Sequence, residues 1–285
     1  MDVLILTSNL RNSASLHLET LLTSDKLNVK MVIYNQGKVM NKRKYYRRRV
    51  RKIFKIGPLG ALNGVRMRKW YSTDIINHLN IAPIDEICRQ NNIPFKTTPN
   101  INHPDTILFM KNSGAELGIS IGNSYIGERV FKTPRYGMIN IHYEELPLYQ
   151  NANAVIWQIY NASDHSGYTI HEIDKHIDTG NILLKELVPI TFHNKLGDTV
   201  THTLANIIQK STGGMVKVLE NFEHFHLART SQKNGVKYTT PSISQFLRML
   251  RTHKAMKVKS LIGSFYFEVV SVSFELETSL GFPTF

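Results

Sequence analysis

Short apolar segments, separated by polar or helix-like spacers, run through the first two thirds of the chain. Buried strands of a parallel sheet typically appear as such runs, and amphipathic stretches between them as helices covering the sheet. The alternation predicts an α/β fold that is Rossmann-like, with a mostly parallel, twisted, doubly wound sheet and helices on both faces. We expect strands within residues 2–7, 29–34, 106–110, 117–121, 138–141 and 168–173, and helices within 16–22, 85–91 and 199–222.

One basic segment carries the whole excess charge of the protein. The formal net charge is +13, thirteen Lys and Arg lie between Lys38 and Lys69, and no acidic residue occurs between Asp25 and Asp74. Apolar residues at helical spacing within 44–56 predict a basic amphipathic helix, which the glycines that follow are expected to end. Such a segment concentrates anions, so a phosphate-bearing small molecule, tRNA and an anionic membrane surface are candidate partners.

The composition bounds the organisation of the chain. A length of 285 residues allows one large domain with an extension, and we expect a catalytic domain over 1–222, with a basic insertion at about 38–70, followed by a small C-terminal extension over 223–285. Residues 261–274 are rich in aromatic and β-branched residues and predict a strand.

The single cysteine, Cys88, excludes an intramolecular disulfide and a cysteine-based zinc site. The histidines lack the spacing of a ligand set, so no metal is expected. The first ten residues predict a buried strand and not a leader peptide, and we expect a cytoplasmic protein, with peripheral attachment at the inner membrane surface as an alternative.

Three polar residues between 138 and 178 form a candidate catalytic group. Asn140 and His142 share one face of a predicted strand, because side chains alternate along a strand, and they lie near its carboxyl end. Ligands of open α/β sheets bind at that end. Asp178, in a loop after the next strand, is expected to reach back to His142. An amide that holds developing negative charge, an imidazole that takes a proton and a carboxylate that sets the tautomer of the imidazole together suit acyl transfer.

The motifs in this region resemble the folate-dependent formyltransferases, the family that includes glycinamide ribonucleotide, methionyl-tRNA and sugar N-formyltransferases. The family pattern is N-x-H, L-P-x-Y, G-x-T-x-H and D-x-G in that order. The chain has Asn140-x-His142, Leu146-Pro147-x-Tyr149, Gly167-x-Thr169-x-His171 and Asp178-Thr179-Gly180. Four ordered motifs over about 65 residues are a specific signal, and a weaker likeness extends over 1–222.

The resemblance implies the roles of individual residues. Asn140, His142 and Asp178 match the catalytic residues, and 10-formyltetrahydrofolate is the implied formyl donor. Two segments match the two walls of the family's folate pocket. The resemblance implies that the backbone of the first segment, residues 122–126, holds the pterin ring. The implied folate-binding residues are Gly122, Asn123, Ser124, Tyr125, Ile126, Asp174 and Ile177, and the implied acceptor-binding residues are Tyr149, Asn151 and Asn153.

Departures from the family pattern bear on the acceptor. Asn151 stands where the family usually has glycine, and asparagine tolerates the left-handed backbone that such a turn needs. Near its N-terminus the chain lacks the glycine-rich phosphate loop of the glycinamide ribonucleotide enzymes, which counts against that acceptor. Its tail past residue 222 is short for the methionyl-tRNA enzymes. We therefore expect the amine of a nucleotide-linked amino sugar as acceptor. Methionyl-tRNA formylation is the alternative, and a catalytically idle protein that binds nucleic acid or another anion is the second alternative.

Overall fold

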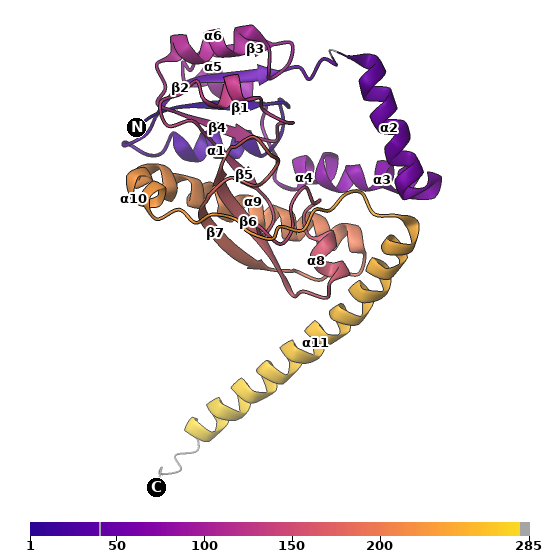
Figure 1. The fold of residues 1–285 in the computed structure, drawn as a ribbon. Helices are drawn as coiled ribbons and strands as arrows, with labels where there is room; N and C mark the ends of the chain where they lie inside the picture. Colours follow the sequence, from indigo (N-terminus) through magenta and orange to yellow (C-terminus); the bar gives the residue numbers. More distant parts are fainter. Residues whose placement is uncertain (40, 280–285) are drawn as a thin grey trace.

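The computed structural model describes residues 1–39 and 41–279, and the side chains of residues 1–39 and 41–262. The described residues form a seven-stranded sheet in the order β3-β2-β1-β4-β5-β6-β7 (Figure 1). Pairing is parallel from β3 to β5 and antiparallel from β5 to β7. The strands are β1 (Asp2–Thr7), β2 (Asn28–Asn35), β3 (Phe95–Thr98), β4 (Leu117–Ile121), β5 (Met138–His142), β6 (His165–Glu172) and β7 (Ile182–Pro189).

Helices cover both faces of the sheet, which confirms the predicted α/β architecture. Because neighbouring strand residues point to opposite faces, Val3 and Ile5 of β1 join one apolar cluster and Leu4 and Leu6 join the other. The larger cluster packs against α1, α5 and α9, and the smaller one against α6 and α7. The helices of the core are α1 (Ser13–Leu21), α4 (Thr73–His78), α5 (Ile84–Gln90), α6 (Pro104–Ser113), α7 (Glu128–Phe131), α8 (Ile156–Tyr160), α9 (Leu196–Glu220) and α10 (Phe222–Leu227).

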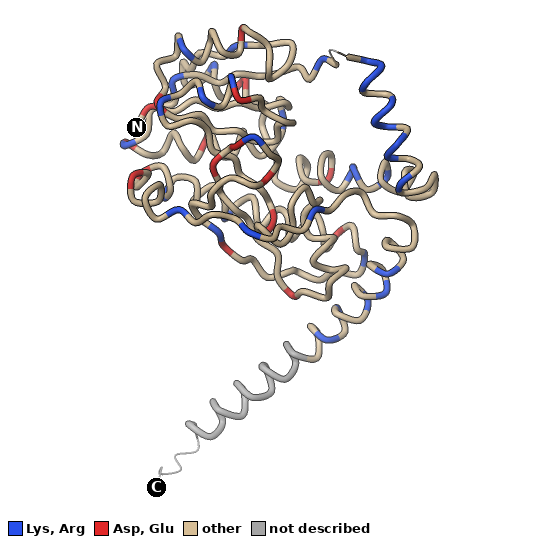
Figure 2. Tube along the Cα trace, in the orientation of Figure 1, with Lys and Arg blue, Asp and Glu red and all other residues tan. Residues whose placement is uncertain are grey.

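The basic segment forms a helical projection at one edge of the molecule. It consists of α2 (Lys42–Ile56), α3 (Pro58–Met67) and the 3₁₀ helix η1 (Arg68–Tyr71). α2 packs against α3 and stands away from the sheet (Figure 1). Lys and Arg follow one another along its whole length (Figure 2). The predicted basic helix is confirmed.

Gly57 ends α2 with a positive φ of 77°, as the sequence predicts, but Gly60 and Gly64 do not break the helical structure that resumes at α3. Pro58 begins α3 at a position where its missing N–H costs nothing. Gly60 and Gly64 lie inside α3 and let it approach the chain before α11: a Cβ on Gly60 would lie 3.2 Å from the Pro241 carbonyl oxygen. Close packing, and not turn formation, explains both glycines.

Two predicted strands are helices. Residues 106–110 belong to α6, which begins at Pro104 with a cap from the His103 side chain and ends at the left-handed Gly114. A short apolar run has no period that separates a buried strand from a buried helix, so the caps decide here. Residues 261–274 lie in α11 (Ile243–Ser279), because aromatic and β-branched residues favour strands only where a sheet receives them.

The segment after α10 packs on the sheet and its helices. Tyr238 stacks on Tyr149, and the Trp157 indole donates a hydrogen bond to the Thr239 carbonyl. Met249 of α11 is fully buried in the larger cluster. Trp157 is therefore part of the core packing. In the part of the chain searched, no helix has the length and apolarity that a membrane span requires.

We predict that Gly180, the glycine of the D-x-G motif, cannot be replaced by alanine without loss of stability. A Cβ there would lie 1.9 Å from the Glu172 carbonyl oxygen, where β6 meets the start of β7. Gly180→Ala is expected to lower the free energy of unfolding by roughly 1–3 kcal/mol, measured by urea denaturation.

Gly213→Ala is the matched control for that variant. Gly213 lies in α9 and has no atom within 4 Å of an added Cβ. Alanine there should raise the stability by about 0.5–1 kcal/mol through helix propensity. Equal effects of the two substitutions would contradict the packing explanation.

Candidate active site

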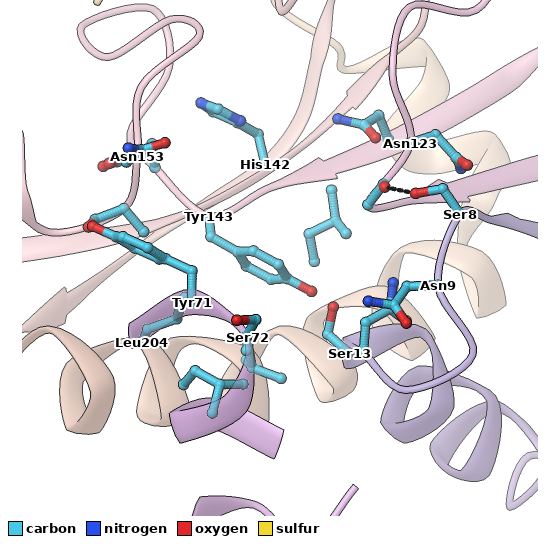
Figure 3. Close-up of a pocket in the computed structure, with 18 of the residues that line it drawn as sticks. Ser8, Asn9, Ser13, Tyr71, Ser72, Asn123, His142, Tyr143, Asn153 and Leu204 are labelled. Carbon is cyan, nitrogen blue, oxygen red and sulfur yellow. Dashed lines mark hydrogen bonds between the residues drawn. The ribbon is translucent and has the colours of Figure 1, made fainter. Parts of the chain in front are cut away.

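A pocket of about 570 Å³ opens at the carboxyl ends of β1, β4 and β5. From β1 the chain adds β2 and then β3 on one side of the sheet. It next adds β4 on the other side of β1, so the strand order reverses between β1 and β4. Ligands of doubly wound sheets bind at such a point. Figure 3 shows side chains from η1, α9, the end of β5 and the loop after β1 around this pocket.

Asn140 is held by a buried histidine on the neighbouring strand. The antiparallel register of β5 and β6 sets Asn140 opposite His171, and the Asn140 amide nitrogen lies 3.2 Å from His171 Nε2. His171 Nδ1 lies 2.8 Å from the Glu172 carbonyl, which can only accept, so Nδ1 carries the proton and Nε2 accepts from Asn140. Burial lowers the pKa of His171 to about 4, against the opposing effect of Asp178. His171 is therefore a neutral residue behind Asn140, and it does not line the pocket.

The tautomer of His142 is set by a backbone carbonyl. His142 Nε2 lies 2.9 Å from the Tyr149 carbonyl oxygen, and must donate to it. Nδ1 then carries the lone pair in the neutral ring and faces Asp178 Oδ2 at 3.9 Å, which is beyond hydrogen-bond distance. The expectation that Asp178 fixes the tautomer was wrong, because the chain after β5 turns back and places the Tyr149 carbonyl against the ring.

Asp178 lies between the two histidines. Its Oδ2 accepts the backbone N–H of Asn151 at 2.8 Å, and its Oδ1 lies 3.9 Å from His171 Nε2. Asp178 and Asn151 both adopt left-handed backbone, with φ of 56° and 52°. Asn151 thus keeps the turn that the family builds with glycine, as predicted, and its N–H fixes the carboxylate beside His142.

The structure brings most of the predicted site residues to the pocket wall. Besides Asn140, His142 and Asp178, the lining includes Gly122, Asn123, Asn151, Asn153 and Ile177. The Asn123 side chain donates to the Leu6 carbonyl at 2.7 Å, which ties the loop after β4 to β1. Asn140, His142 and Asp178 therefore share one cavity, as the sequence predicted.

Other predicted residues lie outside this wall. Tyr149 is buried against Tyr238, and its role in the site is the carbonyl that binds His142. Asp174 orders its own loop by accepting from His176 N–H and the Thr179 hydroxyl, at 2.9 and 2.7 Å. The loop residues Ser124, Tyr125 and Ile126 also do not line the pocket, and the Ile126 side chain is buried in the smaller core cluster.

Sequence reasoning missed the part of the wall contributed by distant segments. Ser8, Asn9 and Arg11 come from the loop after β1, and Tyr71 and Ser72 from η1 and its end. The switch-point rule, applied to β1 and β4, is the signal that predicts the first group. Tyr71 has no such signal, because its place depends on how the basic insertion folds back. Among the described side chains, no three His, Cys, Asp or Glu groups are arranged to hold a metal ion.

A second pocket of about 730 Å³ adjoins the first one. The two share Tyr71, Ser72 and Asn153 as lining residues. Arg49, Lys52 and Arg68 also line the second pocket, and none of them forms an ion pair with a described carboxylate. Burial lowers the pKa of Lys52, and Arg68 and Arg49 lower it further. These uncompensated cations favour an anion in the second pocket.

Glu144 is a buried carboxyl at the floor of the first pocket. It is 1% exposed, and its side chain accepts a hydrogen bond from the Gln158 amide. Burial raises its pKa well above the usual value, against the effect of that hydrogen bond. The folded protein therefore keeps a proton on Glu144 to a higher pH than the unfolded chain does.

We predict that Glu144 makes stability fall as pH rises. Because the folded-state pKa is raised, the free energy of unfolding should decrease above the unfolded pKa, by about 1.4 kcal/mol per pH unit, until the folded-state pKa is passed. Glu144→Gln keeps a neutral partner for Gln158 and should flatten the profile above about pH 5 in urea denaturation. Parallel profiles for the two proteins would show that this carboxyl is not the cause.

Comparison with known proteins agrees with this geometry. A methionyl-tRNA formyltransferase of Ehrlichia chaffeensis is 30% identical over 148 residues, which are 51% of this chain and 47% of that protein. A GDP-perosamine N-formyltransferase of Brucella melitensis biotype 1 is 28% identical over 59% of this chain and 68% of that protein. The chain thus spans about half the length of the methionyl-tRNA relatives it matches.

A solved structure shares the fold. The crystal structure of a sugar N-formyltransferase from Shewanella sp. FDAARGOS_354 superposes with a TM-score of 0.53 at 15% identity, over 88% of this chain and 87% of that one. The formyl transferase family model matches residues 105–219, which include Asn140, His142 and Asp178. This stretch of the chain is therefore similar to the formyl transferase family, and it includes the three polar residues that share the pocket.

Proposed function

We propose that this protein transfers the formyl group of 10-formyltetrahydrofolate to a primary amine. The observation that carries the proposal is the convergence of Asn140, His142 and Asp178 on one pocket, in the family's motif order. In the overall reaction a bond forms between the amine nitrogen and the formyl carbon, the bond from that carbon to the folate nitrogen breaks, and one proton passes from the amine to the folate nitrogen.

His142 is the proton acceptor in this proposal. Its Nε2–H is engaged by the Tyr149 carbonyl, so the free lone pair is on Nδ1, next to Asp178. The neutral ring takes the proton of the attacking amine at Nδ1. The protonated ring then has a donor at Nδ1 for the oxyanion or the leaving nitrogen, and the Asp178 carboxylate at 3.9 Å stabilises the imidazolium.

Asn140 supplies a fixed amide N–H donor for the oxygen that becomes negatively charged in the reaction. One N–H of its amide is bound by His171, so the amide cannot rotate freely and its second N–H is held in a constant direction. Such a preorganised donor stabilises the oxygen of a tetrahedral intermediate, because no reorganisation is needed when the charge develops. Asp178 is likewise fixed by the Asn151 N–H.

The donor pocket has the features that a folate needs. Gly122 has a φ of 69°, and its backbone closely approaches the Asn12 side chain, leaving no room for a larger residue at the pocket edge. Ile177 offers an exposed apolar side chain from the opposite loop. A flat pterin ring between a peptide edge and an apolar side chain fits this arrangement, and the volume is in the range of small-molecule sites.

We propose the amine of a nucleotide-linked amino sugar as the acceptor. The second pocket supports it, since Arg49, Lys52 and Arg68 would face a diphosphate while the sugar amine reaches the first pocket past Tyr71 and Asn153. The longer alignment with the GDP-perosamine enzyme, over 68% of its length, also supports this class.

Methionyl-tRNA is the second candidate acceptor. The methionyl-tRNA formyltransferase of Ehrlichia chaffeensis supports it, and so do the nine cations of α2, which would contact the phosphates of an acceptor stem. A tRNA substrate would make the reaction strongly salt-dependent, and a small nucleotide sugar would not.

An acceptor screen separates these candidates. We predict that the protein, given 10-formyltetrahydrofolate, consumes a nucleotide-linked amino sugar and leaves methionyl-tRNA unformylated, measured by release of tetrahydrofolate and by product mass. Formylation of methionyl-tRNA alone would replace the first candidate by the second. Salt-sensitive binding of tRNA without any turnover would instead identify an idle binding protein.

We predict that turnover depends on Asn140, His142 and Asp178. His142→Ala and Asn140→Ala should each lower turnover by about 10²–10³-fold without loss of folding, because one removes the base and the other an oxyanion donor. Asp178→Asn should also lower turnover while keeping the hydrogen bond from Asn151. His224→Ala, at an exposed position on α10, is the histidine control and should be unchanged. A His142→Ala enzyme as active as the wild type would end this mechanism.

A further inference from the structure

The projection formed by α2 and α3 has an outer surface that the catalytic pockets do not use. Phe54, Leu59 and Leu62 are 85%, 61% and 69% exposed, and they lie on either side of the turn at Gly57. None of the three lines the second pocket, which takes Tyr46, Val50 and other inner residues of these helices. Three large apolar side chains at one turn are therefore open to solvent.

The cations of α2 fall into two groups with different surroundings. Arg49 and Lys52 line the second pocket on the inner side. Another surface hollow is lined only by Asn41 and five cations on the other side of the helix: Arg43, Lys44, Arg47, Arg48 and Arg51. None of these five forms an ion pair with a carboxylate among the described side chains. The outer group is thus a concentrated positive surface that the acceptor site does not employ.

We propose that this outer surface, made of the five outer cations of α2 with Phe54, Leu59 and Leu62, docks the protein on an anionic lipid bilayer. Lys and Arg are attracted to acidic headgroups, and aromatic and aliphatic side chains beside them enter the boundary between headgroups and acyl chains. The proposal goes beyond formyl transfer and does not depend on it.

Charge and apolarity together select this occupant. A second copy of the chain carries the same +13 and the same uncompensated helix, so like charges oppose pairing through this surface. A nucleic acid would use the cations and could stack on Phe54, but gains little from Leu59 and Leu62, whose aliphatic side chains have no base or phosphate to bind. A bilayer uses both groups at once.

Docking would bring the catalytic site to the membrane surface. Tyr71 and Ser72, at the end of the same insertion, line both the first and the second pocket. The inner side of α2 faces the acceptor pocket while the outer side would face lipid. The two sides of one helix would then join an acceptor site to a bilayer.

Vesicle flotation of the full chain tests the proposal. The protein should bind vesicles of phosphatidylcholine and phosphatidylglycerol in equal parts at low salt, and should fail to bind phosphatidylcholine alone. The charge variant Arg47→Gln, Arg48→Gln, Arg51→Gln should weaken binding on the order of a hundredfold, since each cation near an acidic surface contributes a factor of about five. The matched control neutralises three exposed lysines elsewhere (Lys111→Gln, Lys210→Gln, Lys217→Gln) and should bind at least tenfold more tightly than that variant.

The apolar variant distinguishes lipid from nucleic acid. Phe54→Gln, Leu59→Gln, Leu62→Gln keeps helix-compatible residues at exposed positions and should fold like the wild type by circular dichroism. Its affinity for vesicles should fall tenfold or more, and its affinity for tRNA, measured by gel shift, should not change. The proposal is overturned if the apolar substitutions leave vesicle binding unchanged, or if the wild type binds tRNA tightly but does not bind vesicles.

Discussion

The site depends first on the antiparallel register between β5 and β6. It pairs Asn140 with His171 and His142 with Thr169, so the two polar residues of β5 point to one side and each has a fixed neighbour. A slip of one residue would turn both toward the opposite face, because side chains alternate along a strand. The Thr169 hydroxyl also donates to the Glu144 carbonyl, which holds the chain leaving β5 against β6. Strand pairing thus sets both the direction of the amide and the path of the loop that supplies the Tyr149 carbonyl.

Two residues with left-handed backbone fix the position of the Asp178 carboxylate, which the strands alone do not place. Asn151 and Asp178 belong to different loops, and one hydrogen bond joins the backbone of the first to the carboxylate of the second. Gly180 allows the second loop to pass close to the Glu172 carbonyl. The carboxylate beside His142 is therefore placed by backbone geometry, which explains why the motif keeps glycine after Asp178 and tolerates asparagine at position 151.

The sequence predicts those features that rest on local periodicity. The strands β1, β2, β4, β5 and β6 appear as apolar runs, and the side-chain period places Asn140 and His142 on one face. What it misses depends on distant partners. Gly60 and Gly64 look like turn residues until Thr240 and Pro241 pack against them. The tautomer of His142 depends on the backbone seven residues ahead, which no side-chain pattern reveals.

Helix α2 is held by few contacts of its own. Only Ile56 is buried, and Arg43, Arg47, Arg51 and Lys55 follow one another at intervals of four, where like charges are neighbours and each pair costs about 0.2–0.5 kcal/mol. A helix of fifteen residues with so little burial is marginal in water. An anion that lies along it removes the repulsion, so helix formation and anion binding stabilise each other. The same argument applies to a diphosphate on the inner side and to acidic lipid on the outer side, and occupation of either should favour the other by fixing the helix that both contact.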